Sequence, residues 1–201
     1  PWARSRAGAS ALACTELFEK MRPIFKERKR DFLFYTEPSG LCLRKSMDLN
    51  YNYDEQWLVT SLGSPSSQKN WGIRSAKDLA RWVKNRASLL PAGSMTAHHI
   101  DSHDTFWWPS WGKKWRREQF DIQTVQLLTL IFATLPGPFM MFSGGEIGIE
   151  DLLPKLAKVK RSKIWLTGEI NWWTKATDPD GLFAISRKLD KEVSASLVNF
   201  T

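Results

Sequence analysis

Three clusters of polar residues that contain carboxylates follow three short apolar runs of the chain. Glu37 follows residues 31–36, a second cluster at residues 101–104 follows residues 95–100, and a third at residues 143–146 follows residues 138–142. Glycoside hydrolysis needs such carboxyl groups, because one protonates the leaving oxygen while another attacks or stabilises the sugar cation. A single carboxylate at a strand end is more often a helix cap or a solvated charge. Whether these carboxylates are catalytic therefore depends on the helices and strands that position them.

Apolar runs alternate with amphipathic segments along most of the chain. We expect strands at residues 31–36, 46–53, 95–100 and 138–142, and helices at residues 10–29 (with a kink or break at Pro23), 55–62, 75–90, 118–135 and 152–162. Ser75 is a candidate cap for its helix. Strands that alternate with helices predict an α/β fold with a parallel sheet, in which the carboxyl ends of the strands lie on one face.

The pattern changes at Gly168. Residues 169–173, 181–187 and 193–200 are expected to form successive strands, with a hairpin turn at residues 188–191. This predicts the start of a separate, antiparallel β domain. The chain begins with Pro1 and its last apolar run stops without a turn signal, so both ends are interpreted as cuts in a longer protein.

Three segments together resemble the alpha-amylase family of glycoside hydrolases. Residues 99–105 resemble the motif of its seventh barrel strand, in which an apolar residue, Asp, a small polar residue, His and Asp follow one another. Residues 31–38 resemble the fifth-strand motif, and residues 135–148 the eighth-strand segment. The three occur in the order of the family, and the resemblance covers nearly the whole chain.

The resemblance implies a partial (β/α)8 TIM barrel. Residues 1–167 would be the carboxy-terminal half of the catalytic barrel, with strands five to eight, and residues 168–201 the truncated start of a β-sandwich-like domain. The full-length protein would be a retaining α-glucan-active hydrolase or transglycosylase that acts on an α-glucan or oligosaccharide. The fragment alone is expected to be inactive, because the strand with the nucleophile would precede Pro1.

The resemblance also assigns roles to individual residues. Glu37 would be the general acid/base, Asp104 the third carboxylate that distorts and binds the sugar, and His103 a donor to hydroxyls of the same sugar. The sequence departs from the family at Thr36, where a Gly commonly precedes the Glu, and at Gly145, where an Asp is common. These departures leave the glucan, the linkage and the choice between hydrolysis and transglycosylation open.

A loop rich in tryptophan and basic residues follows Asp104. It contains four of the 11 tryptophans, Trp107, Trp108, Trp111 and Trp115, among Lys113, Lys114, Arg116 and Arg117. Flat indole faces suit sugar binding, and Trp107 and Trp108 are therefore candidate substrate-binding residues. A loop that packs on its own aromatic rings is an equally good interpretation, and cation–π pairs could form in either case.

Two further interpretations are weighed against the enzyme. Histidines and carboxylates at residues 98–104 could bind zinc in a metal-dependent hydrolase, but their spacing differs from the two-zinc motif His-x-His-x-Asp-His. The histidines could also be plain core or capping residues. A non-catalytic amylase-like interaction module is the other rival, against which the presence of both Glu37 and Asp104 counts.

Composition excludes several classes of protein. The net charge of +8 is spread along the chain without a nucleic-acid-binding motif, and the longest apolar stretch, residues 125–142, is interrupted by Pro136, Gly137 and Pro138. We therefore expect neither a nucleic-acid partner nor a membrane span. Two cysteines form no disulfide framework, which slightly favours the cytoplasm. No cofactor is expected, although the family allows a structural calcium ion in the full-length protein.

Overall fold

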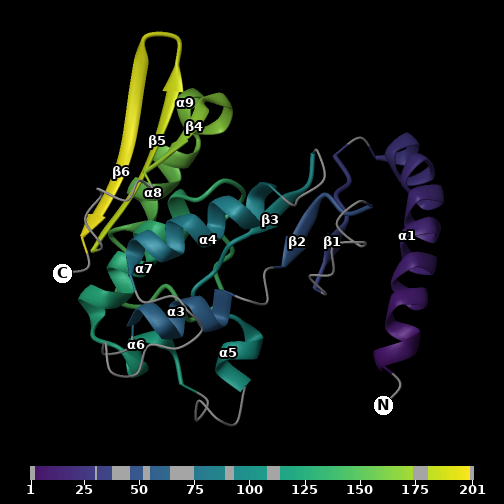
Figure 1. Ribbon diagram of the computed structural model, residues 1–201, viewed down its shortest axis with the longest axis horizontal. Helices are drawn as coiled ribbons and strands as arrows, with labels where there is room; N and C mark the ends of the chain where they lie inside the picture. Colours follow the sequence, from purple (N-terminus) through teal and green to yellow (C-terminus); the bar gives the residue numbers. More distant parts are fainter. Residues whose placement is uncertain are drawn as a thin grey trace. The chain divides into compact units, whose positions relative to one another are not determined.

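The computed structural model describes residues 3–29, 31–37, 46–51, 55–63, 75–88, 93–107, 114–173 and 181–199. It separates into two compact units. The first comprises Pro1–Tyr53 and Arg86–Ala97, and the second comprises Asp54–Asn85 and His98–Thr201. Figure 1 shows the helices and strands of both units.

Among the described residues, the first unit contains the helix α1 (Ala3–Arg28) and a parallel sheet. The strands are β1 (Tyr35–Thr36), β2 (Leu49–Tyr51) and β3 (Met95–Ala97). They pair in the order β1-β2-β3, with Leu49 opposite both Tyr35 and Met95. The predicted parallel arrangement of the first three strands is confirmed, although each strand is shorter than expected. Pro23 lies inside α1, which is assigned as one helix through that residue.

Asp48 holds the parts of the first unit together. Its carboxylate accepts hydrogen bonds from Arg22 Nη1 of α1 at 2.8 Å and from the backbone N–H of Phe34 at 2.8 Å. Partial burial acts to raise the pKa of Asp48, but the Phe34 hydrogen bond and the Arg22 charge outweigh it and leave this pKa below its usual value. One carboxylate therefore fixes both α1 and the segment that leads into β1.

Seven helices of the described part of the chain lie wholly or mostly in the second unit. They are α3 (Glu55–Gly63), α4 (Ala76–Ser88), α5 (His103–Trp107), α6 (Arg116–Gln119), α7 (Ile122–Thr134), α8 (Leu153–Lys160) and α9 (Lys163–Thr167). The predicted cap of α4 is confirmed, since Ser75 Oγ accepts from the N–H of Asp78 at 3.1 Å. Helix α7 begins at Ile122 and not near residue 118, because Asp121 is extended and caps it by accepting from Thr124 N at 2.8 Å.

The run at residues 138–142 is not a regular strand, contrary to the prediction. Within the described part of the chain it pairs through one parallel bridge, between Phe139 and His98. His98 N donates to Pro138 O at 2.9 Å, and Met140 N donates to His98 O at 2.7 Å. Pro138 has no N–H to extend the ladder, and turns begin at residue 143, so the pairing stays short.

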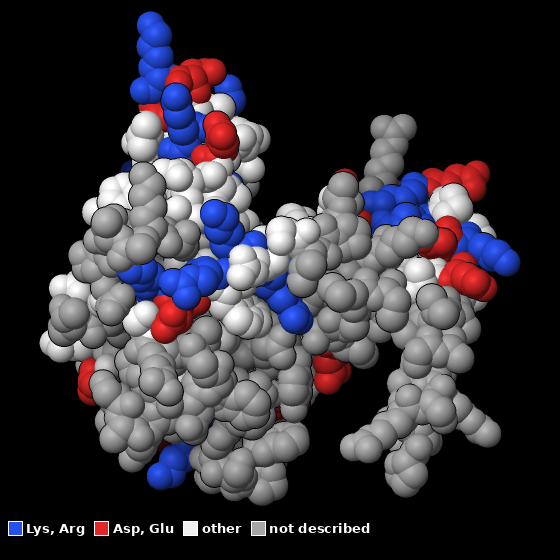
Figure 2. Space-filling model, viewed as in Figure 1, with Lys and Arg blue, Asp and Glu red and all other residues white. Residues whose placement is uncertain are grey.

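The three strands predicted after Gly168 are present as an antiparallel sheet. They are β4 (Glu169–Trp172), β5 (Leu182–Leu189) and β6 (Glu192–Asn199), in the order β4-β5-β6. The predicted hairpin turn is confirmed, and its residue Asp190 has a positive φ of 54°. Figure 2 shows basic and acidic side chains together at the tip of this hairpin, where Lys188, Asp190, Lys191 and Glu192 lie.

The sheet of β4–β6 shares a hydrophobic core with the helices of the second unit. The core includes Leu79 of α4, Leu128 and Ile131 of α7, and Phe183 and Ile185 of β5, all fully buried. Two hydrogen bonds reinforce the packing, from Trp165 Nε1 to Ser194 Oγ at 2.9 Å and from Thr134 Oγ1 to Ser196 Oγ at 3.1 Å. The boundary between residues 167 and 168 stays a prediction, and the strands beyond it pack closely on the helices before it.

A search of the described residues finds no helix with the length and apolar character that a membrane crossing requires.

Candidate active site

The segment that follows β3 is anchored at both of its ends. His98 at its start forms the parallel bridge to Phe139. At its other end Ser102 and Thr105 bond to each other, because Ser102 N donates to Thr105 Oγ1 at 2.8 Å and Thr105 N donates to Ser102 Oγ at 3.3 Å. This reciprocal cap starts α5 at His103 and fixes the backbone that carries the candidate site residues.

His103 and Asp104 are brought together at the start of α5. His103 Nε2 lies 3.5 Å from Asp104 Oδ1, with the His103 side chain half exposed and the Asp104 side chain mostly buried. A carboxylate beside an imidazole at a strand end can hold the hydroxyl groups of a sugar through charge-assisted hydrogen bonds. The structure thus brings His103 and Asp104 side by side, and their role at a sugar stays a prediction.

Glu37, the predicted acid/base, belongs to the first unit. It directly follows Thr36, the last residue of β1, and its side chain is exposed. Thr36 itself is buried. The short strand thus ends in a carboxylate at the carboxyl edge of the parallel sheet, as the fifth-strand motif implies.

The predicted sugar-binding tryptophans fall mostly on residues outside the description. Trp107 is the last residue of α5, but its side chain, like Trp108 and Trp111, lies outside the described residues. Trp115 is described and packs on the protein: its ring lies 5.4 Å from that of Phe142 and covers Gly144. The Arg117 guanidinium lies 4.9 Å from the Trp115 ring centroid, which confirms a cation–π pair in this loop.

Asp101 and Arg116 form a buried polar pair that the sequence did not identify. Asp101 Oδ1 accepts from Arg116 N at 3.0 Å, and the Arg116 guanidinium donates to Ile100 O at 3.1 Å, Thr60 Oγ1 at 2.9 Å and Gln119 Oε1 at 2.7 Å. Arg116 is fully buried, so this member of the basic loop packs inside the protein and does not belong to a sugar-binding rim. Burial raises the pKa of Asp101, and the Arg116 hydrogen bond and charge offset part of that rise. A run of basic and aromatic residues carries no sign of which member turns inward.

Gly145 lies against Asp101 in the turn at residues 143–148. A Cβ atom at position 145 would stand 3.4 Å from Asp101 Oδ2 and 3.0 Å from the carbonyl oxygen of Phe142. An aspartate at this position would bring a second carboxylate beside a buried one, which costs free energy. The departure of Gly145 from the family pattern is thus matched by a close approach in the structure.

Glu55 is a further buried polar residue that the sequence did not single out. It begins α3 and is 1% exposed, and its carboxylate contacts both His98 and His99. His98 Nδ1 faces Glu55 Oε1, and His98 Nε2 lies 2.8 Å from Pro136 O. Both ring nitrogens of His98 are therefore engaged, which supports the core interpretation of this histidine over a metal ligand. An acidic residue at a helix start is an ordinary sequence feature, so nothing marked Glu55 in advance.

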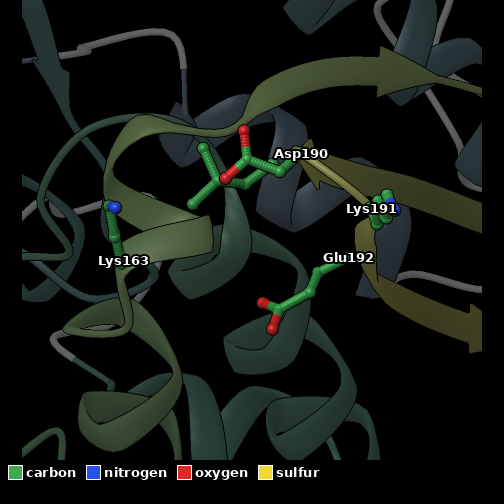
Figure 3. Close-up of a pocket in the computed structure, with 5 residues that line it drawn as sticks. Lys163, Asp190, Lys191 and Glu192 are labelled. Carbon is green, nitrogen blue, oxygen red and sulfur yellow. The ribbon is translucent and has the colours of Figure 1, made fainter.

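A shallow hollow of about 420 Å³ lies beside the β5–β6 turn. It is lined by Lys163, Leu189, Asp190, Lys191 and Glu192. Figure 3 shows Lys163 coming from α9 and the charged residues of the turn from the hairpin. The lining contains two lysines and two carboxylates, so the hollow has no single charge, and none of the predicted site residues lines it.

No protein-family model matches the chain, and no curated protein matches it. Solved structures do resemble it. One is a noncanonic maltogenic alpha-amylase from Thermotoga neapolitana, at TM-score 0.70 and 15% identity over 92% of this chain and 46% of that one. A second is a cyclic alpha-maltosyl-(1→6)-maltose hydrolase from Arthrobacter globiformis, in complex with maltose. Its TM-score is 0.70 and its sequence identity 16%, over 92% of this chain and 45% of that one. A third is an alpha-amylase from Geobacillus thermoleovorans, complexed with acarbose. Its TM-score is 0.71 and its sequence identity 16%, over 93% of this chain and 46% of that one.

These matches agree with the fold that the three sequence motifs implied. The chain spans less than half of the length of each of the three solved structures. Over that stretch, this chain has the fold of the alpha-amylase family enzymes.

Proposed function

We propose that this chain is the carboxy-terminal half of the catalytic barrel of a retaining α-glucan-active glycoside hydrolase or transglycosylase. Residues 1–167 correspond to the part of the barrel that holds strands five to eight and their helices, with residues 138–142 in place of a regular eighth strand, and residues 168–201 begin the next, β-rich domain. By the complete protein we mean this chain joined to the other half of the barrel. The remaining strands and the nucleophilic aspartate belong to that other half, which precedes this chain.

The observation that carries this proposal is the parallel order of β1, β2 and β3. Parallel neighbours end at the same edge of their sheet, and Glu37 directly follows β1. The segment with His103 and Asp104 starts at the residue after β3. The segments that resemble the fifth- and seventh-strand motifs of the family thus each follow a strand of one parallel sheet, which supports the proposal.

The proposed mechanism uses three carboxyl groups. Glu37 gives its proton to the glycosidic oxygen while the upstream aspartate attacks the anomeric carbon, and the C–O bond to the leaving sugar breaks. Asp104 and His103 bind hydroxyls of the same sugar and hold its distorted ring. Glu37, now ionised, takes a proton from water or from a sugar hydroxyl, which then displaces the aspartate and releases the product. The cleavage of an acetal in this way requires no metal and no organic cofactor.

A non-catalytic interaction module is the main alternative from another class. Such a module has no need of the carboxylates, whereas this chain keeps Glu37 and an Asp104 whose neighbour His103 lies within 3.5 Å. A metal-dependent hydrolase is less well supported, because both ring nitrogens of His98 already have protein partners.

The experiment is to produce the complete protein and to follow the release of reducing ends from an α-glucan. The proposal expects cleavage by the wild type and a loss of at least ~10²-fold in Asp104→Asn. Glu169→Ala, which removes an exposed carboxylate of β4, serves as the matched control and should cleave as the wild type does. A well-folded complete protein that binds glucan without cleaving it would favour the interaction module.

A further inference from the structure

We infer that Glu55 is a positioning residue for the segment that carries His103 and Asp104, an inference that rests on the proposed function. One buried carboxylate at the start of α3 holds two segments of the site: residues 98–104, which follow β3, and residues 136–146, which contain the glycine-rich turn. No motif singled out Glu55, and it does not enter the chemistry proposed for Glu37 and Asp104.

Both oxygens of the Glu55 carboxylate bind the first of these segments. Oε2 accepts from the backbone N–H of His99 at 2.7 Å and lies 3.4 Å from His99 Nδ1. Oε1 contacts His98 Nδ1. Glu55, His98 and His99 are at most 4% exposed, so water cannot replace these contacts without opening the protein.

His98 passes the connection on to the second segment. Its Nε2–H donates to Pro136 O at 2.8 Å, and its backbone pairs with Pro138 O and Met140 N. Because the carbonyl of Pro136 can only accept, the ring nitrogen Nε2 is the donor in this bond, and Nδ1 is left to contact Glu55 Oε1. Residues 136–140 lead into the turn at residues 143–148, where a Cβ at Gly145 would stand 3.4 Å from Asp101 Oδ2. Glu55 therefore holds, through His98, both the segment that contains Asp101 and the segment that leads to Gly145.

The expected consequence is an effect on catalysis larger than the effect on substrate binding. A reacting group displaced by about 1 Å can cost ~10²-fold in rate. Asp104 acts most strongly on the distorted sugar near the transition state, so a loose segment should lower kcat more than it raises KM. A residue needed only for folding would lower the amount of active protein and leave both constants of the remaining enzyme unchanged.

The test compares wild type, Glu55→Ala, Glu55→Gln and the control Glu169→Ala in the complete protein. Two quantities are measured: kcat and KM on an α-glucan oligosaccharide, and amide hydrogen exchange at His99 and Met140 against Ile185 of β5. In Glu55→Ala we expect kcat to fall roughly 10- to 100-fold. Exchange at His99 should be at least ~10-fold faster, while Ile185 changes less than about twofold.

Glu55→Gln should rescue both readouts to within about threefold of wild type. The amide oxygen can accept from His99 N, and the amide NH₂ can donate to Nδ1 of a neutral His98 that keeps its Nε2–H bond to Pro136. If Glu55→Ala does not fold, Glu55→Gln decides: a folded Gln variant in which kcat falls while His99 stays protected, or His99 loses protection while kcat stays, overturns the inference. The inference is equally overturned if Glu55→Ala keeps both kcat and the exchange rate at His99 near their wild-type values. A wild type that cleaves no glucan refutes the proposed function instead, and His99 exchange still reports whether Glu55 holds the segment.

Discussion

Lys160 of α8 has its ammonium group tied to the end of α7. Its Nζ donates to Leu135 O at 2.8 Å and also to Gly137 O. Burial lowers the pKa of Lys160 from 10.5 to about 8, and the nearby Arg187 charge adds to the effect. The Lys160 side chain thus satisfies two carbonyl groups, but its buried charge lowers the free energy of unfolding of the protein.

The cost appears as a pH dependence of stability with a defined sign. Below pH 8 Lys160 is protonated in both the folded and the unfolded protein, so it contributes no slope. Between about pH 8 and 10.5 the unfolded chain keeps the proton that the folded protein has released, so the free energy of unfolding rises with pH. A difference of about 2.5 pKa units is worth roughly 3 kcal/mol, of which about 2.5 kcal/mol is reached by pH 10.

The assay is urea unfolding of the complete protein at pH 7, 8, 9 and 10, for wild type, Lys160→Met and Lys158→Met. The unfolding free energy of wild type minus that of Lys160→Met should increase by about 2.5 kcal/mol over this range. Lys158 is exposed on the same helix, so its variant should track the wild type. The reasoning would be refuted if the difference in unfolding free energy between wild type and Lys160→Met stayed constant within about 0.5 kcal/mol from pH 7 to pH 10.

Three further predictions concern the chain, its turn and its cofactors. The chain of 201 residues alone should be inactive and should aggregate, because Leu33 and Tyr35 at β1 are 53% and 47% exposed. A soluble monomer that melts cooperatively and cleaves glucan would contradict this prediction. Gly144→Ala should destabilise the complete protein by roughly 2–4 kcal/mol in urea, since φ is 96° and a Cβ would lie 2.8 Å from the Trp115 ring. Gly93→Ala, with φ 83° and open space around it, should cost only about 1 kcal/mol, and equal losses would show that the Trp115 contact is unimportant. Chelation should leave glucan cleavage unchanged when the protein stays folded, and a loss restored by stoichiometric zinc would favour the metal-dependent alternative.

The parallel sheet and the antiparallel tail could be predicted because they depend on local patterns. Apolar runs bounded by turn residues located β1, β2 and β3, and the residues of the β5–β6 turn located the hairpin. Helix α7 began later than expected because the cap at Asp121 overrides the helical tendency of the residues before it. The run at residues 138–142 looked like a strand, but its pairing is limited to Phe139.

The buried polar residues could not be predicted, because their partners are distant in sequence. Arg116 satisfies its guanidinium through Ile100, Thr60 and Gln119, and a basic loop gives no hint of such partners. Glu55 contacts His98 and His99 across more than forty residues, and its position at a helix start suggests only a solvated charge. His103 and Asp104 could be proposed because their motif is contiguous, and Glu37 because it ends a recognisable strand, and the roles of all three stay predictions.

The most direct test of the central claim is the dependence of Glu37→Gln on the leaving group. In the complete protein this variant should keep the fold and the sugar site but lose proton donation. General acid catalysis is typically worth ~10² to 10⁴ in rate, so cleavage of a natural glucan should fall by that factor. The first step with an activated aryl glycoside, which leaves without a proton, should fall far less. If Glu37→Gln cleaves the glucan within a few fold of wild type, Glu37 is not the acid/base and the proposed site is wrong.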